Sequence, residues 1–118
     1  MYRKYAVRSR RLRSLIADLA QGGQPSIERA AAQLGLSIRT LQRQLEREGL
    51  TYSKLVESTR YEMARRLLGD PTLSVAEVST KLGYRSPSNF SRAFARWDGA
   101  SPKEYRTAAA ASVEAGTE

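Results

Sequence analysis

Residues 73–106 read LSVAEVSTKLGYRSPSNFSRAFARWDGASPKEYR, and this stretch predicts the architecture of the whole chain. It predicts a short helix that begins with a capping box at the N-cap Ser74 and ends at Gly83, which can take a positive φ. A second helix is expected to begin near Ser86, with Pro87 in its first turn, where no backbone N–H is needed. A short helix, a glycine turn and a second helix are typical of a helix-turn-helix, whose second helix can enter a DNA major groove.

The second of these predicted helices has two chemically different faces. Side chains advance by about 100° per residue along a helix, so the large apolar residues gather on one side: Phe90, Ala93, Phe94 and Trp97. The other side carries small polar residues and arginines: Ser88, Ser91, Arg92 and Arg96. The pattern indicates either a DNA-reading helix or an ordinary helical hairpin with a solvated outer face.

The remaining sequence predicts further helices and no strand, because its apolar residues recur at helical spacing and never alternate. The expected helices span residues 7–21, 26–34, 37–48 and 52–68, with a last short one from Pro102. In the 37–48 helix, the residues expected to face the core are Ile38, Leu41 and Leu45. The fold class is therefore all-α, with about seven helices.

The chain contains an internal repeat. The N-cap, inner apolar residues and terminal glycine of the 26–35 segment recur 48 positions later, in the 74–83 segment. After one inserted residue, the match pairs the outer arginines of the two second helices: Arg43 with Arg92, and Arg47 with Arg96. Two helix-turn-helix subdomains are therefore predicted. They span residues 7–50 and 70–107, with a linker helix over 51–69 and a disordered, Ala-rich tail over 108–118.

Composition favours a polyanionic partner and argues against catalysis. The 118 residues include 20 Lys and Arg against 12 Asp and Glu, which gives a formal net charge of +8 and a pI of about 10.3. The chain has no Cys and no His, so thiol chemistry, Cys-ligated zinc and the commonest acid–base catalyst are excluded. We expect no enzymatic activity, no catalytic residue, no metal site and no cofactor. No apolar run has membrane-spanning length and no signal peptide is recognisable, so a cytoplasmic protein is expected.

Two strings of the sequence resemble the DNA-binding domain of the AraC/XylS family of bacterial transcription regulators. They are LSIRTLQRQLEREG, residues 36–49, and LGYRSPSNFSRAFARWDGASPKEYR, residues 82–106. The resemblance extends over residues 12–106. It implies a sequence-specific transcription regulator. In that family, two helix-turn-helix subdomains linked by a long helix insert their recognition helices into successive major grooves on one face of DNA.

The resemblance also implies which residues contact DNA. Those expected to read base edges are Arg39, Gln42 and Arg43 in the first unit and Ser88, Asn89 and Arg92 in the second. Residues at helix ends and flanks are expected to contact phosphates: Ser37, Arg47, Ser86, Ser91 and Arg96.

Two features qualify the resemblance. Tyr61 stands where the family's linker helix usually has an aliphatic residue, which questions the local packing. Pro87 and Ser88 have short side chains at the start of the second recognition helix. Fewer direct base contacts are therefore expected from the second unit.

Double-stranded DNA is the expected partner, and the resemblance adds RNA polymerase and an N-terminal effector-binding or dimerisation domain. Because nothing before residue 12 resembles such a domain, the chain is expected to be the C-terminal part of a longer regulator, with a single-domain regulator as the alternative. The alternative function is a sequence-indifferent, nucleoid-like architectural DNA-binding protein or a recombinase arm. A regulator should prefer selected over random duplex by a large factor, and an architectural protein by a small one.

The length of the 52–68 helix suggests how one chain could reach two grooves. Seventeen residues correspond to about 25 Å of helix. Successive major-groove segments on one face of DNA are about 34 Å apart, a span that this helix and two small subdomains would cover. We therefore expect a single chain on an asymmetric site.

Overall fold

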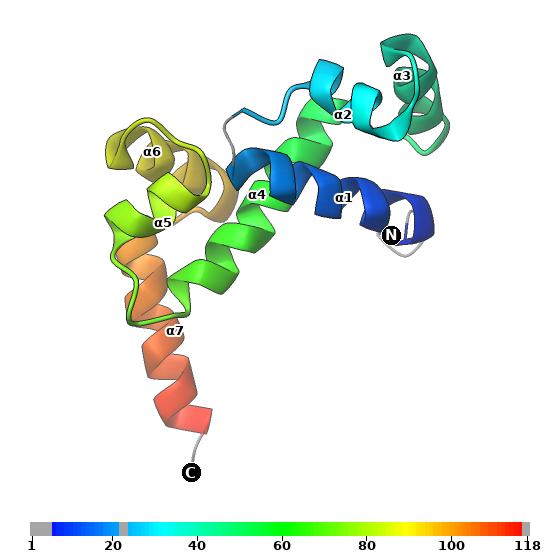
Figure 1. Cartoon of the computed structure of the whole chain (residues 1–118). Coiled ribbons are helices and arrows are strands. Elements are labelled where there is room, and N and C mark those ends of the chain that lie inside the picture. Colours follow the sequence, from blue (N-terminus) through cyan, green and yellow to red (C-terminus); the bar gives the residue numbers. More distant parts are fainter. Residues whose placement is uncertain (1–5, 22–23, 117–118) are drawn as a thin grey trace. The chain divides into compact units, whose positions relative to one another are not determined.

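The computed structural model describes residues 6–21 and 24–116, and the side chains of residues 10–21 and 24–111. Over the described residues the chain forms seven helices and no strand (Figure 1), which confirms the predicted all-α class. The helices are α1 (Ala6–Gln21), α2 (Ile27–Leu34), α3 (Ile38–Arg47), α4 (Tyr52–Leu68), α5 (Val75–Lys81), α6 (Pro87–Asp98) and α7 (Pro102–Gly116). The described starts of α1–α6 agree with the predicted ones to within about one residue, because caps and glycines mark these helix ends in the sequence.

The chain divides into two compact units, Met1–Arg60 and Tyr61–Glu118, and the division falls inside α4. Leu55 belongs to the core of the N-terminal unit, whereas Leu68 belongs to the core of the C-terminal unit. The predicted linker over 51–69 is therefore not a separate segment. Each half of α4 supplies apolar side chains to one unit.

In the N-terminal unit, α1, α2 and α3 bury their apolar stripes together with the first half of α4. The core consists of Leu12, Ile16, Leu19, Ala30, Ala31, Leu41, Leu45 and Leu55. Gly35 ends α2 with a φ of 68°, and the N–H of Leu36 donates to the carbonyl of Ala31 at 2.9 Å. This closed turn allows α3 to pack against the same core as α2.

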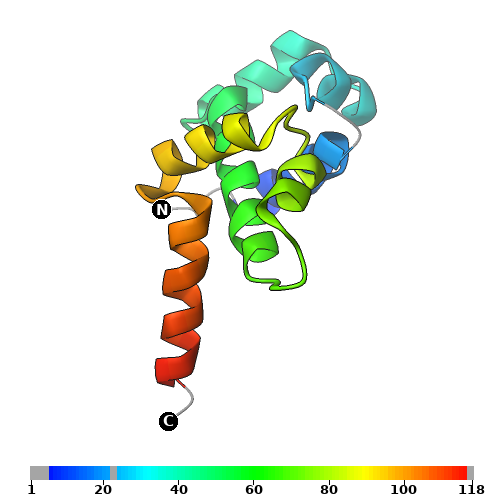
Figure 2. The ribbon, with the colours of Figure 1, turned by 90° about the vertical axis from the view of Figure 1, so that its left-hand side faces the viewer.

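In the C-terminal unit, the core is built around two fully buried phenylalanines. The rings of Phe90 and Phe94 lie 5.9 Å apart, and the Phe94 ring lies 5.4 Å from that of Tyr105 in α7. Smaller side chains complete the core: Ala64, Leu68, Val78 and Leu82. Figure 2 shows the turn that leads from α6 into α7. Tyr105 near the start of α7 therefore fastens this helix to the unit.

Two helices of the C-terminal unit begin with reciprocal side-chain caps. The hydroxyl of Ser74 accepts the N–H of Glu77 at 3.0 Å, and the Glu77 carboxylate accepts the N–H of Ser74 at 3.0 Å, which confirms the predicted capping box. Ser101 and Glu104 make the same arrangement at the start of α7. These hydrogen bonds hold the pKa of both glutamates below its usual value. These hydrogen bonds therefore stabilise the folded state fully at pH values above the ordinary glutamate pKa. The stabilisation is lost as the pH falls through the lowered pKa of the folded state.

The expectation that Ile38 faces the core is wrong. Ile38 is the first residue of α3 and is 37% exposed, whereas Leu41 and Leu45 are buried. A helical side chain points back towards the N-terminus, so the side chain of a first residue points beyond the turn that contacts the core. Helical spacing alone does not show this end effect.

The prediction of a disordered tail over 108–118 is wrong for the residues that the structure describes. α7 continues from Pro102 to Gly116, and residues 117–118 lie outside the described residues. Alanine has the highest intrinsic helix propensity, so an Ala-rich segment can extend a helix that is already nucleated and capped. The lack of an amphipathic pattern was therefore a poor guide here.

Tyr52 offers a test of the N-terminal unit at alkaline pH. Its hydroxyl donates to the carbonyl of Pro25 at 2.7 Å, and burial raises the pKa of Tyr52 to about 12. Because the folded-state pKa is raised, the stabilisation is fully present below the unfolded pKa of about 10 and is lost as pH rises through 12. Thermal melts from about pH 9 to pH 12 should show this decline, and Tyr52→Phe should lessen it. Equal declines in both proteins would contradict the expectation.

Candidate nucleic-acid interface

α3 is positioned by its inner face and by its N-cap. Leu41 and Leu45 on the inner face are buried in the core of the N-terminal unit. Ser37 lies before the helix in an extended conformation, and its hydroxyl accepts the N–H of Thr40 at 3.1 Å. These contacts fix the rotation of α3 about its own axis, so that its opposite face lies in solvent.

The outer face of α3 carries the residues predicted to read bases in the first unit. Arg39, Gln42 and Arg43 are all exposed, and their spacing places them on one side of the helix. Arg43 has no hydrogen-bond or ion-pair partner among the described residues. Arg47, the predicted phosphate contact, is also exposed. The structure thus brings these four side chains together on one solvent-facing surface.

Ser37, a predicted phosphate contact, acts as the N-cap of α3, and its hydroxyl is hydrogen-bonded to Thr40. The hydroxyl of Ser37 donates to Thr40 Oγ1 at 2.8 Å. The hydroxyl proton of Ser37 is therefore already used, whereas the exposed Thr40 keeps its own proton. Sequence reasoning missed Thr40. A hydroxyl residue three positions after an N-cap serine was the available indication.

α6 is held by an additional hydrogen bond that α3 lacks. Phe94 anchors its inner face, and the hydroxyl of Ser86 caps it by accepting the N–H of Asn89 at 3.2 Å. The buried hydroxyl of Ser79 in α5 donates to the carbonyl of Ser86 at 3.1 Å. The repeat places Ala31 at the position equivalent to Ser79, and alanine has no hydroxyl. The helix-turn-helix of the C-terminal unit is thus braced across its turn.

The outer face of α6 carries the residues predicted to read bases in the second unit: Ser88, Asn89 and Arg92, all exposed. Nη2 of Arg92 donates to Oδ1 of Asn89 at 2.7 Å, so these two residues form a pair. Among the predicted phosphate contacts, Arg96 is exposed, whereas Ser86 and Ser91 are partly buried.

Arg85 is a further basic residue that sequence reasoning did not assign to the interface. It is exposed in the turn between α5 and α6, directly before the α6 cap. It is also the residue inserted when the second repeat is aligned with the first. An arginine inserted next to a recognition helix was the available indication of a phosphate contact.

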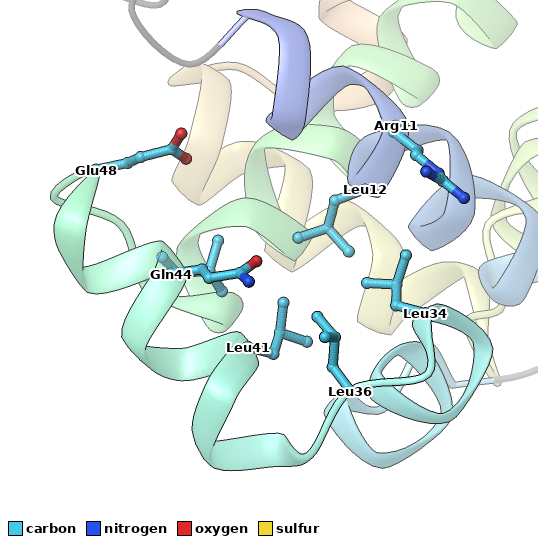
Figure 3. Close-up of a pocket in the computed structure, with 8 residues that line it drawn as sticks. Arg11, Leu12, Leu34, Leu36, Leu41, Gln44 and Glu48 are labelled. Atoms are coloured by element: carbon cyan, nitrogen blue, oxygen red, sulfur yellow. The ribbon is translucent and has the colours of Figure 1, made fainter.

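A hollow of about 330 Å³ lies behind α3 in the N-terminal unit (Figure 3). Leucines from α1, from the end of α2 and the turn after it, and from α3 form most of its wall: Leu12, Leu34, Leu36, Leu41 and Leu45. Arg11, Gln44 and Glu48 supply the polar part of its lining. No predicted DNA-contacting residue lines the hollow. It is therefore separate from the outer face of α3.

The C-terminal unit accommodates Tyr61, the residue that departs from the family pattern. Its ring lies 5.8 Å from that of Phe94 and 6.2 Å from that of Trp97. Its hydroxyl donates to Asp98 Oδ1 at 2.7 Å, and this hydrogen bond raises the pKa of Tyr61. The guanidinium of Arg65 lies 5.5 Å from the ring centre. Ring contacts and a satisfied hydroxyl thus take the place of an aliphatic side chain.

Within residues 6–21 and 24–116, no helix has the length and apolar character needed to cross a bilayer. In the same part of the chain, no cluster of His, Cys, Asp and Glu could hold a metal ion. What the outer faces of α3 and α6 do present is positive charge and hydrogen-bond donors. These groups match phosphates and the acceptor atoms of base edges.

The fold and the two outer faces define a protein with two helix-turn-helix units, in which α3 and α6 occupy the position of recognition helices. A family model described as a helix-turn-helix domain matches residues 30–108, which is more than half of the chain. The match includes both second helices and all of α4.

Comparison with known proteins gives the same class. The HTH-type transcriptional regulator VirS of Mycobacterium tuberculosis (strain ATCC 25618 / H37Rv) is 40% identical over 101 residues, which cover 86% of this chain and 30% of VirS. The transcriptional regulator CdpR from Pseudomonas aeruginosa is 37% identical with a TM-score of 0.74, covering 90% of this chain and 33% of CdpR. The DNA-binding domain of AdpA, solved with a target DNA, is 30% identical with a TM-score of 0.71, covering 85% of this chain and 90% of that domain.

The chain belongs to the AraC-type helix-turn-helix family, as the two sequence strings predicted. It is a sequence-specific DNA-binding domain of the transcription-regulator type. The chain spans about 30% of the length of the curated relatives that it matches over most of its own length.

Proposed function

We propose that one copy of this chain binds an asymmetric promoter site, with α3 and α6 as recognition helices in successive major grooves. The observation that carries the proposal is the pair of solvent-facing arginines at equivalent repeat positions, Arg43 and Arg92. Each lies opposite a buried inner face, Leu41 and Leu45 in α3 and Phe90 and Phe94 in α6. Neither arginine is used by its core, so each is available to a groove.

The two outer faces differ, and this difference supports an asymmetric site. α3 presents Arg39, Gln42 and Arg43, whereas α6 presents Ser88, Asn89 and Arg92. Different side chains select different bases. Two unlike readers on one chain match two unlike half-sites, whereas a palindrome would match two copies of one reader.

The remaining roles follow from this assignment. We propose that Arg47, Arg96, Ser86 and Ser91 contact phosphates, together with Arg85, and that Thr40 does so in place of the predicted Ser37. Exposed arginines and hydroxyl groups at helix ends and flanks suit this role.

A cytoplasmic location, a contact with RNA polymerase and a further effector or dimerisation domain in the intact protein are proposals of the same kind. The high positive charge and the absence of Cys support the proposed cytoplasmic location.

Arg43→Ala and Arg92→Ala test the two-reader assignment. A bidentate arginine–guanine contact contributes about 1–3 kcal/mol of discrimination. Arg43→Ala should therefore relax base preference in one half of the site and leave the other half unchanged, and Arg92→Ala should do the converse. The measurement is the affinity for every single-base variant of a site selected from random DNA. Bound stoichiometry measured on the same DNA should be one chain per site.

Arg47→Ala is the matched control, because it removes an arginine from the same helix as Arg43 without removing a proposed base reader. It should weaken binding to all sequences by a similar factor. If both reader variants stay folded and keep every base preference, the assignment is wrong. A small ratio between selected and random duplex would instead favour the architectural alternative, and two chains on a palindrome would contradict the asymmetric site.

A further inference from the structure

The pairing of Arg92 with Asn89 has no counterpart in the first unit. Nη2 of Arg92 donates to Oδ1 of Asn89 at 2.7 Å on the solvent side of α6. Asn89 itself is anchored, because its backbone N–H donates to the Ser86 cap at 3.2 Å. The position equivalent to Asn89 in α3 is Thr40, whose Oγ1 accepts from Ser37. Arg43 has no hydrogen-bond partner among the residues described.

The pair presents mainly hydrogen-bond donors to a ligand. Arg92 has five N–H donors, of which Asn89 takes one. The Asn89 amide uses its oxygen on Arg92 and retains its NH2 group as a donor. Guanine offers two acceptors in the major groove, O6 and N7, whereas adenine offers one acceptor and one N–H donor. In a bidentate contact with adenine, the amide oxygen of Asn89 would have to accept a hydrogen bond from the adenine amino group. That oxygen already accepts from Arg92, and the neighbouring positive charge disfavours a second hydrogen bond to it.

We propose that Asn89 is a positioning residue that holds the guanidinium of Arg92 for guanine, and that it does not read adenine. The inference rests on the proposed base-reading role of Arg92. A rotamer-rich side chain that is ordered only on binding loses about 2- to 12-fold in affinity. Asn89 removes part of this loss before DNA arrives. This pre-ordering offsets the short side chains of Pro87 and Ser88 at the start of the same helix.

The test is a double-mutant cycle measured over single-base variants of the selected site. The four proteins are the full chain and its Asn89→Ala, Arg92→Ala and doubly substituted forms. Asn89→Ala should lower guanine discrimination at the base pair that depends on Arg92 by about 2- to 12-fold. In the Arg92→Ala background the same substitution should change nothing at that base pair. Both side chains are exposed, so thermal melts should stay close to that of the unsubstituted chain.

A gain-of-function variant gives an independent readout. Thr40→Asn places an asparagine three residues before Arg43, as Asn89 stands before Arg92. Because Thr40→Asn also removes the phosphate contact proposed for Thr40, it should weaken binding to all sequences by a similar factor. Against that uniform loss, guanine discrimination should rise at the base pair that depends on Arg43 and stay unchanged at the base pair that depends on Arg92. No rise at the Arg43 base pair would contradict positioning by an asparagine.

Three results separate the possible failures. If Asn89→Ala abolishes an adenine preference at its own base pair, Asn89 is a direct reader and the inference is overturned. If Asn89→Ala has no effect, or an equal effect with and without Arg92, positioning is also overturned. If Arg92→Ala itself changes no base preference, the proposed function of α6 fails, and the inference falls with it.

Discussion

Replacing Phe94 with alanine is expected to unfold the C-terminal unit or bring it close to unfolding. Phe94 is fully buried, and its ring contacts those of Tyr61, Phe90 and Tyr105 at centroid distances of 5.8, 5.9 and 5.4 Å. Truncating a buried phenylalanine costs about 3–5 kcal/mol, because apolar contact is lost and a cavity remains. A domain of this size has a total stability of about 5–15 kcal/mol, so one substitution removes a large share of it.

The measurement is a thermal melt followed by circular dichroism. For a small domain, the expected loss corresponds to a fall of at least about 12 °C in melting temperature. Arg96→Ala is the control, since Arg96 is exposed on the same helix, and it should change stability by no more than about 0.5 kcal/mol. Arg96→Ala should instead weaken DNA binding. A Phe94→Ala protein that melts with the unsubstituted chain would show that the phenylalanine cluster does not hold this unit together.

The affinity for DNA is expected to fall by about a thousandfold or more between 50 and 200 mM salt. The formal charge of +8 and the exposed arginines of both outer faces suit roughly eight phosphate contacts. Each contact releases a condensed counterion, and 6–10 contacts give losses of about 10³–10⁵ over this range. Binding isotherms at four or five salt concentrations measure the slope.

Single substitutions show which side chains contribute to that slope. Arg47→Ala and Arg96→Ala should each make the logarithmic slope shallower by about 0.9. Ser88→Ala removes no charge, so any change that it makes in affinity should leave the slope as it is. A nearly flat salt response of the unsubstituted chain would mean that the basic outer faces do not bind DNA.

Local chemistry accounts for what was predicted correctly. The Ser74–Glu77 capping box and the positive φ of Gly83 depend on residues within a few positions of one another. The buried faces of α3 and α6 follow in the same way from helical periodicity, and so do the exposed arginines on their opposite sides. The sequence by itself therefore determined these features, because each depends only on neighbours along the chain.

Helix ends and helix length show where such local rules stop. Ile38 fits the apolar spacing of α3 and is still exposed, because the first residue of the helix points past the core. The Ala-rich segment after Thr107 lacks an apolar stripe and is still helical as far as Gly116. Periodicity reports which face is buried and does not report how far a helix extends.

Contacts between distant residues came from the tertiary structure alone. Tyr61 and Asp98 are 37 positions apart, and their hydrogen bond shows how an unusual residue is accommodated. The division of α4 between two cores depends on which partners Leu55 and Leu68 meet after folding. The hydrogen bond between Arg92 and Asn89 is local, three positions apart in α6, but the arginine rotamer that makes it is one of several that the sequence allows. The sequence pattern indicates which face of a helix a side chain occupies. Which residue far along the chain it contacts depends on the tertiary structure.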